Sequence, residues 1–512
     1  MTRHQDRILG VLCGFDRMLF RGTLRTISYA QGANAFLRTK GILLKDFGTF
    51  AHSCTQDIAA HAERTALEAG RPYLYLSSSS ERKEDRARAI AEQDGIEQGL
   101  VCVLYCVEPC MGFDIYKNRA TEHLELVSRQ RKCRFFYFYY MDREFGLLHV
   151  RLQSWFPFEV QVCLNGHSYL ARQMDREGIA YEQRRNCFSS IDNLPRAQEL
   201  FDRLERREWA KTLDVFARRV NPLPGTRLRG VFGYYWSVRQ CEFATDILFK
   251  DRTALADVYP ALWQHALAHF SSPDVMRFLG KKLTRAFSGE AVTDMDRRPE
   301  GVRVKHSIDG NSIKMYDKEE TVLRIETTIN NPRWFRVLRR ISRQGRTALA
   351  WLPMRKGVSD TQRRADVSRA ANARYLDALA VVGEQTPSHR ILDSVSKPVT
   401  KDGHTYRALR PVSPDEAALF EAILHGEHLL HGFTNSRVHS IRFPTPPPAD
   451  PDRRRRSARL SRKLRLLRAH GLIRKVPRTH GYRITAKGHQ IMTTALLFRH
   501  SDVALLRPNK AG

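Results

Sequence analysis

The sequence lacks any apolar run of the roughly 18 residues that a membrane-spanning helix requires, so we expect no membrane association. Its N-terminal apolar stretch is too short and too soon interrupted for a secretory signal peptide. The nine cysteines are scattered, and Cys102, Cys106 and Cys110 do not have the C-x2-C spacing of a zinc site. These absences favour a protein of the reducing cytoplasm whose cysteines are structural.

Acidic residues are also scarce. The chain has 85 Lys and Arg against 55 Asp and Glu, which gives a net charge of +30. Its hydrophobic content of 42% and aromatic content of 10% are typical of a globular protein and exclude a disordered one. Because a globular protein this basic usually meets nucleic acid, we expect DNA as the favoured partner, RNA as the alternative, and a nucleoid-associated location in the cytoplasm.

The sequence contains no helical repeat or heptad series, and its 512 residues predict roughly three to four domains. The expected fold class is α+β and multidomain. An α/β layer is expected at the N-terminus, followed by antiparallel meanders with helices and then a C-terminal helical module with two short strands. The predicted ranges are 1–125 (α/β), 126–222 (β-meander plus helices), 223–405 (central α+β domain with a basic β-meander) and 411–512 (nucleic-acid-binding domain).

Residues 131–165 alternate with period two and predict a three-stranded meander. Within it, six consecutive aromatics, Phe135 to Tyr140, must occupy both faces of a strand, so they either fill a core or stack bases. Further on, Glu242 and Asp246 lie four residues apart and would share one face of a helix. Such a pair could hold a divalent metal or form a solvated edge.

A second meander, over residues 301–332, is the strongest candidate for a site. Alternation directs its valines, isoleucines and leucines to one face, and Arg303, Lys305, Lys314, Tyr316, Lys318, Arg324 and Glu326 to the other. This polar set is adequate for phosphodiester transfer. Tyr316 would attack phosphorus, and Lys305 and Arg324 would stabilise the developing charge. Glu326, with Asp317, Glu242 or Asp246, would hold Mg²⁺ or Mn²⁺. The alternative is a basic sheet that only cradles phosphates.

The strings "KMYDK" and "LRIE" in this meander resemble those of replication initiators from rolling-circle plasmids and filamentous phages. The resemblance covers about a dozen residues and implies a tyrosine nucleophile with an Arg-x-Glu strand. The His-x-His metal motif of relaxases is absent from the sequence.

Residues 333–410 are basic and are expected to be helical, and Arg363, Arg364 and Arg369 would continue a phosphate-binding track or form a solvated face. Beyond them, an arginine-rich helix is expected from Arg453 to His470, followed by two short strands joined by a tight turn. Leu460, Leu464 and Leu467 recur at helical spacing and would face a core. The residues expected to contact nucleic acid are Arg454, Arg455, Arg459, Arg462, Lys463, Arg465, Arg468, Lys475, Arg478 and Arg483.

This C-terminal segment resembles the winged helix-turn-helix of MarR-type bacterial regulators, which implies DNA binding and is compatible with a homodimer. The proline run "PTPPPADPD", which we expect to be non-helical, stands where those regulators have a short turn. The chain as a whole is similar to a large uncharacterised bacterial family that carries the strings found here at residues 99–110, 149–166, 311–318 and 323–332. Such families are often labelled transcription regulators or assigned to mobile elements.

Two functions remain open. The first is nucleic-acid binding without chemistry, as in a regulator. The second is a metal-dependent nuclease, transposase-like enzyme or replication initiator that uses its C-terminal module to bind its target. The absence of a sharp catalytic motif favours the first, and the size of the chain with its polar sheet face favours the second.

Overall fold

A computed structural model describes residues 6–77, 81–231, 233–281, 290–298, 301–343, 346–380, 388–424, 433–443, 450–477 and 479–500. The chain forms two compact units, Met1–Trp263 with Ala286–Asn372 and Gln264–Arg285 with Ala373–Gly512. The expected mixture of helices and sheets is confirmed. The four ranges predicted from the sequence do not coincide with the two units, because one continuous sheet runs through the first three of them.

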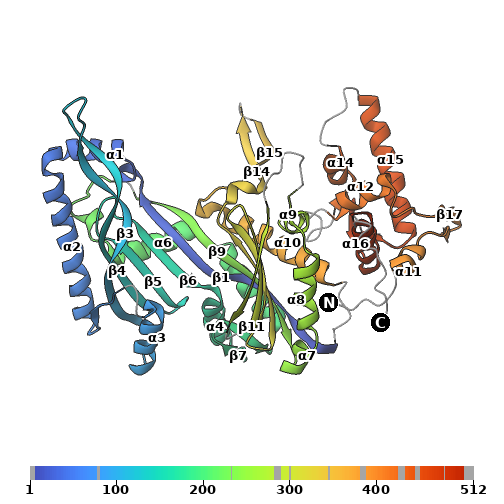
Figure 1. Ribbon diagram of the computed structural model, residues 1–512, viewed down its shortest axis with the longest axis horizontal. Coiled ribbons are helices and arrows are strands. Elements are labelled where there is room, and N and C mark those ends of the chain that lie inside the picture. The colour runs from blue at the N-terminus through green and yellow to red at the C-terminus, as the bar shows by residue number, and fades with distance from the viewer. Residues whose placement is uncertain are drawn as a thin grey trace. The chain divides into compact units, whose positions relative to one another are not determined.

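That sheet has eleven strands and forms the body of the first unit (Figure 1). All neighbouring strands pair antiparallel except β2 and β3. In chain order its strands are β1 (Ile8–Leu24), β2 (Tyr73–Tyr75), β3 (Gly99–Lys117), β4 (Leu124–Asp142), β5 (Gly146–Gln153), β6 (Val160–Asn165), β9 (Tyr234–Phe249), β10 (Val292–Arg298), β11 (Gly301–Ile308), β12 (Asn311–Lys318) and β13 (Val322–Ile329).

The two halves of the sheet share one topology. Read outward from the centre, the order is β1-β6-β5-β4-β3 on one side and β9-β13-β12-β11-β10 on the other. In each half a long strand is followed by helices and then by a meander whose last strand returns to pair with the long strand. Since β1 and β9 pair antiparallel, the halves are related as by a two-fold axis between these strands. Both predicted meanders are confirmed as antiparallel.

Helices and two small hairpins accompany this sheet. The helices are α1 (Ala30–Thr39), α2 (Phe47–Glu68), α3 (Lys83–Gln93), α4 (Gly166–Glu177), α5 (Leu194–Glu205), α6 (Trp209–Val220), α7 (Arg252–Ala256), α8 (Tyr259–His269) and α10 (Thr361–Leu379). Of these, α8 and α10 continue into the second unit. The hairpins pair β7 (Tyr181–Arg184) with β8 (Cys187–Ile191) and β14 (Arg336–Arg343) with β15 (Arg346–Pro353). The second hairpin corrects the expectation that residues 333–410 are helical throughout.

The main core contains one face of the central strands and the helices α2 and α6. Phe20 of β1, Val150 of β5 and Val162 of β6 are fully buried there with Ile58 of α2 and Leu213 of α6. The aromatics from Phe135 to Tyr140 are all buried and divide between this core and a smaller one beneath α3. They therefore fill cores and are not available to stack bases.

The segment that contains Glu242 and Asp246 is strand β9, which corrects the expectation of a helix there. Strand periodicity still places both carboxylates on one face of the sheet, because residues two and four positions apart point the same way.

The second unit has its own hydrophobic core. It contains α9 (Ser272–Phe278), α11 (Ser388–Asp393), β16 (Val399–Lys401), β17 (His404–Tyr406), α12 (Pro414–Ile423), β18 (Phe433–Thr434), α14 (Asn435–Arg442), α15 (Asp450–Ala469), β19 (Ile473–Lys475), β20 (Gly481–Ile484) and α16 (Ala486–His500). Strands β18, β20 and β19 form a small sheet in that order. Helix α15 begins at Asp450, so Pro451 is accommodated in its first turn, where a missing N–H costs little. The preceding prolines lie outside the described residues.

Among the described residues, no helix has the length and apolarity needed to cross a membrane.

Candidate functional site

Polar side chains gather on one face of the sheet where β1, β9, β13 and β12 lie side by side. Cross-strand pairing brings Asp246 opposite Arg324 and Arg324 opposite Tyr316. Two residues farther along β13 and β12, Glu326 lies opposite Lys314. Opposite residues in an antiparallel sheet share a face. The predicted set of Tyr316, Arg324 and Glu326 is therefore assembled, and β9 adds its two acids.

Asp16 joins this group through an irregularity in β1. The register between β1 and β9 shifts between Phe15 and Met18, so Asp16 and Arg17 together face Glu242. A β-bulge of this kind re-aims side chains and is common beside functional sites. Helix α4 then begins against the bulge at Gly166, where a Cβ atom would lie 1.7 Å from the carbonyl oxygen of Phe15. This close approach requires glycine.

Arg324 is the buried centre of the group. Its Nε and Nη2 donate to the two oxygens of Asp246, each at 2.6 Å, and its Nη1 donates to Asp16 Oδ2 at 3.0 Å. Nη2 also donates to the carbonyl of Asn186 at 2.7 Å. The side chain of Arg324 is fully buried. It therefore orients two carboxylates. A residue that stabilises a phosphorane would have to be accessible to the substrate, and Arg324 is not.

His167 connects the same two acids. Its Nδ1 lies 3.0 Å from Asp16 Oδ1 and its Nε2 lies 3.2 Å from Asp246 Oδ2. Burial alone would raise the pKa of Asp16, but the charge of Arg324 and the hydrogen bond from His167 hold that pKa well below its usual range. Burial and Arg324 lower the pKa of His167, yet its hydrogen bonds with both aspartates outweigh them and raise that pKa overall.

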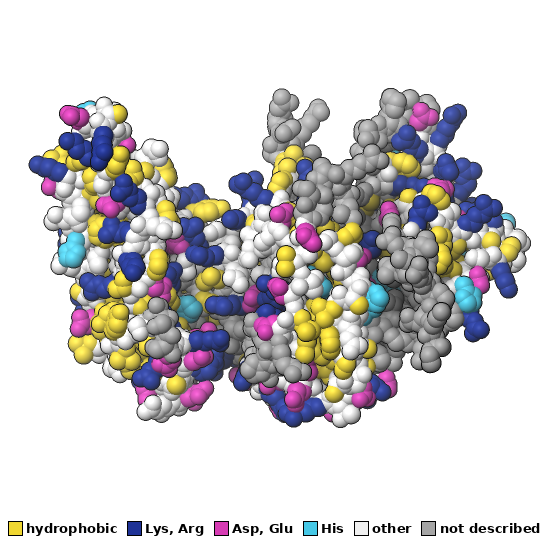
Figure 2. All heavy atoms as spheres, in the orientation of Figure 1, with side chains coloured by type: hydrophobic (Ala, Val, Ile, Leu, Met, Phe, Trp, Pro, Cys, Tyr) yellow, Lys and Arg dark blue, Asp and Glu magenta, His cyan; other side chains and the backbone are white. Residues whose placement is uncertain are grey.

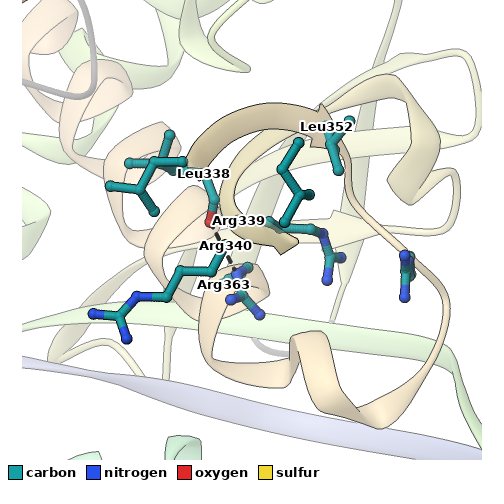
Figure 3. A pocket seen from close by; sticks show the side chains of 8 residues that line it. Leu338, Arg339, Arg340, Leu352 and Arg363 are labelled. Carbon is teal, nitrogen blue, oxygen red and sulfur yellow. Dashed lines mark hydrogen bonds between the residues drawn. The ribbon is translucent and has the colours of Figure 1, made fainter. Parts of the chain in front are cut away.

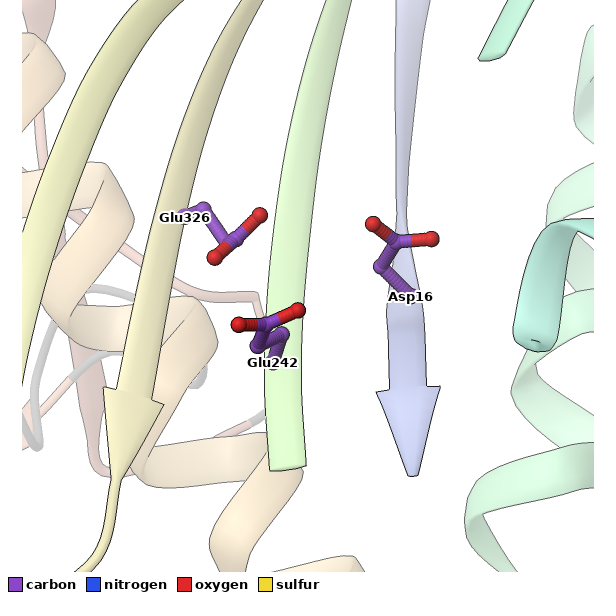
Figure 4. A group of neighbouring side chains, drawn as sticks. All are labelled: Asp16, Glu242 and Glu326. Carbon is purple, nitrogen blue, oxygen red and sulfur yellow. The ribbon is translucent and has the colours of Figure 1, made fainter. Parts of the chain in front are cut away.

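A triad of carboxylates lies beside Arg324. One oxygen each from Asp16, Glu242 and Glu326 lie within 4.8 Å of one another, on three adjacent strands (Figure 4). Lys314 Nζ donates to Glu326 at 2.5 Å and to Glu242 at 3.2 Å. Burial and the nearby charge of Glu326 raise the pKa of Glu242. We call these three residues the carboxylate triad.

The donors of the triad fit a hard divalent cation. Mg²⁺ and Mn²⁺ prefer oxygen ligands, and Mg²⁺ binds them at about 2.1 Å, which allows ligand oxygens to be at most about 4.2 Å apart. Neighbouring ligand oxygens of an octahedral ion lie about 3.0 Å apart, so the triad oxygens, now within 4.8 Å of one another, would have to draw together around the ion. Lys314 neutralises part of the charge and would have to turn away from Glu326 and Glu242.

Tyr316 reaches the triad from β12. Its hydroxyl donates to Glu326 Oε2 at 2.7 Å, so Glu326 is positioned to accept the phenolic proton. Burial and the charge of Glu326 raise the pKa of Tyr316 well above its usual range. The phenol is therefore protonated at neutral pH, and it could act as a nucleophile only while it passes its proton to Glu326.

Two predicted residues lie apart from this cluster. Asp317 follows Tyr316 on β12 and so points to the opposite face of the sheet, where burial raises its pKa to about 6. Lys305 lies on β11, opposite Lys314 and one strand farther from the triad. The prediction missed Asp16, His167 and Asn186, because each reaches the site from a distant part of the chain.

The predicted nucleic-acid-binding residues lie mainly on α15. Leu460, Leu464 and Leu467 are buried in the core of the second unit. The exposed basic side chains are those of Arg454, Arg455, Arg459, Arg462, Arg465, Lys475 and Arg483. Arg468 is half-buried, Lys463 donates to Asp415, and Arg478 lies outside the described residues. Lys and Arg side chains are also distributed over the rest of the visible surface (Figure 2).

Comparisons with protein-family models, with curated proteins and with solved structures find no match to this chain. Its function must therefore be argued from the site and the charged surfaces.

Proposed function

We propose that this chain binds nucleic acid, with DNA as the favoured partner, through the basic surface of α15 and of β19–β20. The observation that carries this proposal is the division of α15 into a buried leucine face and an exposed arginine face. Arginines in this arrangement can contact the phosphates of a duplex and release its counterions. An exposed helix of this kind also fits the major groove.

The surrounding elements support the same proposal. Helices α12, α14 and α15 precede the strands β19 and β20, which is the order of elements in a winged helix. Asn435 at the start of α14 donates to Ser461 of α15 at 2.6 Å, and Asp415 of α12 accepts from Lys463 and Arg442. These polar contacts fix α15 against the two preceding helices while its arginine face stays exposed. We infer a winged helix-turn-helix in which α15 is the recognition helix.

Titration of the full chain with labelled duplex DNA at several salt concentrations tests this proposal. Binding should weaken steeply with salt, with a slope of log K against log salt of about −0.9 for each phosphate contacted. The absence of binding to DNA and to RNA, or binding that salt does not weaken, would contradict it.

A second candidate function, metal-dependent cleavage or transfer of DNA phosphodiesters, is favoured by the carboxylate triad. A bound Mg²⁺ or Mn²⁺ would polarise the phosphodiester and neutralise charge in the transition state. Asp16, Glu242 and Glu326 would hold the ion. Tyr316 would attack phosphorus as its proton passes to Glu326, so that a phosphotyrosine bond forms while the bond from phosphorus to the leaving oxygen breaks, and the leaving oxygen would take up that proton from Glu326.

Incubation with labelled single- and double-stranded DNA and Mg²⁺ or Mn²⁺ tests the second candidate. Cleavage with a covalent protein–DNA adduct, lost in Tyr316→Phe while binding is retained, would support the tyrosine as nucleophile. Cleavage that persists in Tyr316→Phe but is lost in Glu326→Gln would instead favour direct hydrolysis. Tight binding without cleavage of any substrate would contradict the second candidate, and nucleic-acid binding would remain as the proposed function.

A further inference from the structure

A shallow cavity of about 410 Å³ lies in the first unit where the β14–β15 hairpin meets the start of α10 (Figure 3). Half of its lining residues are arginines. The lining consists of Leu338, Arg339, Arg340, Ile341, Leu349, Leu352, Arg355 and Arg363. We call this cavity the arginine pocket.

One carboxylate, that of Asp360, organises the arginine pocket. It pairs with Arg339, lies 3.0 Å from Arg363 Nη1, and accepts from the backbone N–H of Arg355 at 2.7 Å. Four arginines thus line a pocket in which one acid pairs with two of them. Within the described part of the chain, no acid pairs with the side chain of Arg340 or of Arg355, both of which are exposed. The pocket therefore keeps a positive charge that suits an anion.

Arg339, in the lining of the pocket, keeps one donor unsatisfied although it pairs with Asp360. Its side chain is 11% exposed, and its Nε is buried with no hydrogen-bond partner among the described residues. A buried guanidinium N–H without an acceptor is costly, and a phosphate oxygen is a suitable acceptor. The apolar half of the pocket adds a second requirement, since Leu338 and Leu349 are 37% and 62% exposed. A nucleotide unit meets both requirements, because its phosphate can contact the arginines and the face of its base can contact the leucines.

The pocket connects directly to the centre of the sheet. After Arg355, the Lys356 carbonyl accepts from Val238 N on β9 at 2.8 Å, and Gly357 bridges to Ser237. Ser237 in turn lies opposite Arg21 of β1. From Ser237 to Glu242 of the carboxylate triad is five residues along β9, or about 17 Å.

An arginine row runs along this interval and continues past Ser237. Arg17, Arg21 and Arg25 are exposed at successive steps of four residues along β1 and its end. Arg21 lies 2.5 Å from Glu159, and Arg239 lies 3.9 Å from the same acid. The guanidinium of Arg25 lies 5.1 Å from the ring centroid of Tyr235, which is 41% exposed. Together with Arg239 the row offers four cations, two of which pair with Glu159 while Arg17 lies near Glu242. Tyr235 adds an aromatic ring on which a base can stack.

We propose that the arginine pocket and the arginine row bind one single strand of nucleic acid and lead its backbone to the carboxylate triad. The proposal rests on the proposed nucleic-acid binding and names a second contact surface, in the first unit. A single strand is the occupant because its bases are free to contact the exposed leucines and Tyr235. The bases of an intact duplex are stacked inside it.

The test compares a labelled single-stranded oligonucleotide with its duplex, using the full chain and two double variants. Arg340→Ala with Arg355→Ala removes exposed pocket cations, and Arg38→Ala with Arg64→Ala is a matched control on the exposed surfaces of α1 and α2. The pocket variant should bind the single strand about tenfold more weakly. Its salt slope should also become shallower by about 1.4, since each lost contact to a single strand contributes about 0.7. The control should match the wild type, and thermal melts should show that both variants fold.

The outcomes separate this inference from the proposed function. Unchanged single-strand binding by the pocket variant, with the wild type binding normally, would overturn the inference alone. An equal loss of single-strand and duplex binding would contradict a single strand as occupant. If the wild type binds no nucleic acid at all, both the inference and the proposed function fail.

Discussion

Arg324 binds Asp246 through two parallel hydrogen bonds, Nε to Oδ1 and Nη2 to Oδ2, both 2.6 Å long and both fully buried. Its remaining contacts reach Asp16 and the backbone of Asn186, so residues from three distant parts of the chain depend on one guanidinium. The geometry of the carboxylate triad depends on this pair, because Asp16 is held between Arg324 and His167.

Replacement of Arg324 by alanine should therefore destabilise the first unit strongly. Two buried aspartates would lose their counter-charge, and breaking a buried ion pair from one side typically costs about 3 to 5 kcal/mol. Urea unfolding of Arg324→Ala and of the wild type measures the difference in free energy of unfolding. Arg252→Ala, whose exposed salt bridge to Glu320 is solvated, is the control and should cost less than about 1 kcal/mol. Equal effects of the two substitutions would contradict the account of Arg324.

The raised pKa of His167 predicts a pH-dependent contribution to stability. A group whose pKa is raised on folding stabilises the folded state fully below its unfolded pKa of about 6.5, and this contribution is lost as pH rises through the folded value. The difference in free energy of unfolding between wild type and His167→Gln should thus be larger at about pH 6 than at about pH 9. The lowered pKa values of Asp16 and Asp246 act only at acid pH, below about 4, and do not interfere. A difference that grows with pH would contradict this assignment.

Two acids on opposite faces of the sheet, Glu242 of β9 and Asp317 of β12, provide a matched test of the carboxylate triad as a metal site. If Mn²⁺ binds there, it should raise the melting temperature of the wild type, because a ligand of the folded state alone stabilises it. Glu242→Gln should abolish that increase. Asp317→Asn, on the opposite face of β12, should preserve it. A shift that survives in Glu242→Gln, or that is lost in Asp317→Asn, would place the ion elsewhere.

The sequence predicted the local structure of the site well. Alternation in residues 301–332 was sufficient to place Tyr316, Arg324 and Glu326 on one face, because the period of a strand is set by local geometry. The face shared by Glu242 and Asp246 was also predicted correctly, although by way of a helix, since a spacing of four is compatible with both periods. The same alternation places Asp317 on the other face of the sheet, so its assignment to the metal site was inconsistent with the strand pattern.

The rest of the site depends on pairing between distant segments. Asp16 is close to Glu242 because β1 and β9 are neighbours and because a bulge turns its side chain toward β9. No local pattern encodes either fact. The same holds for Arg324, whose neighbours in the sequence suggested a phosphate ligand but whose burial between Asp16 and Asp246 assigns it to the interior of the protein.

The salt dependence of duplex DNA binding by Arg462→Ala with Arg465→Ala tests the central claim most directly. Both side chains are exposed on α15, and their removal leaves its buried leucines in place. If α15 contacts DNA phosphates, the slope of log K against log salt should become shallower by about 1.8, or about 0.9 for each lost contact. The Arg38→Ala, Arg64→Ala variant should keep the wild-type slope. An unchanged slope in the α15 variant, with DNA still bound, would contradict the proposal that this helix is the DNA-binding surface.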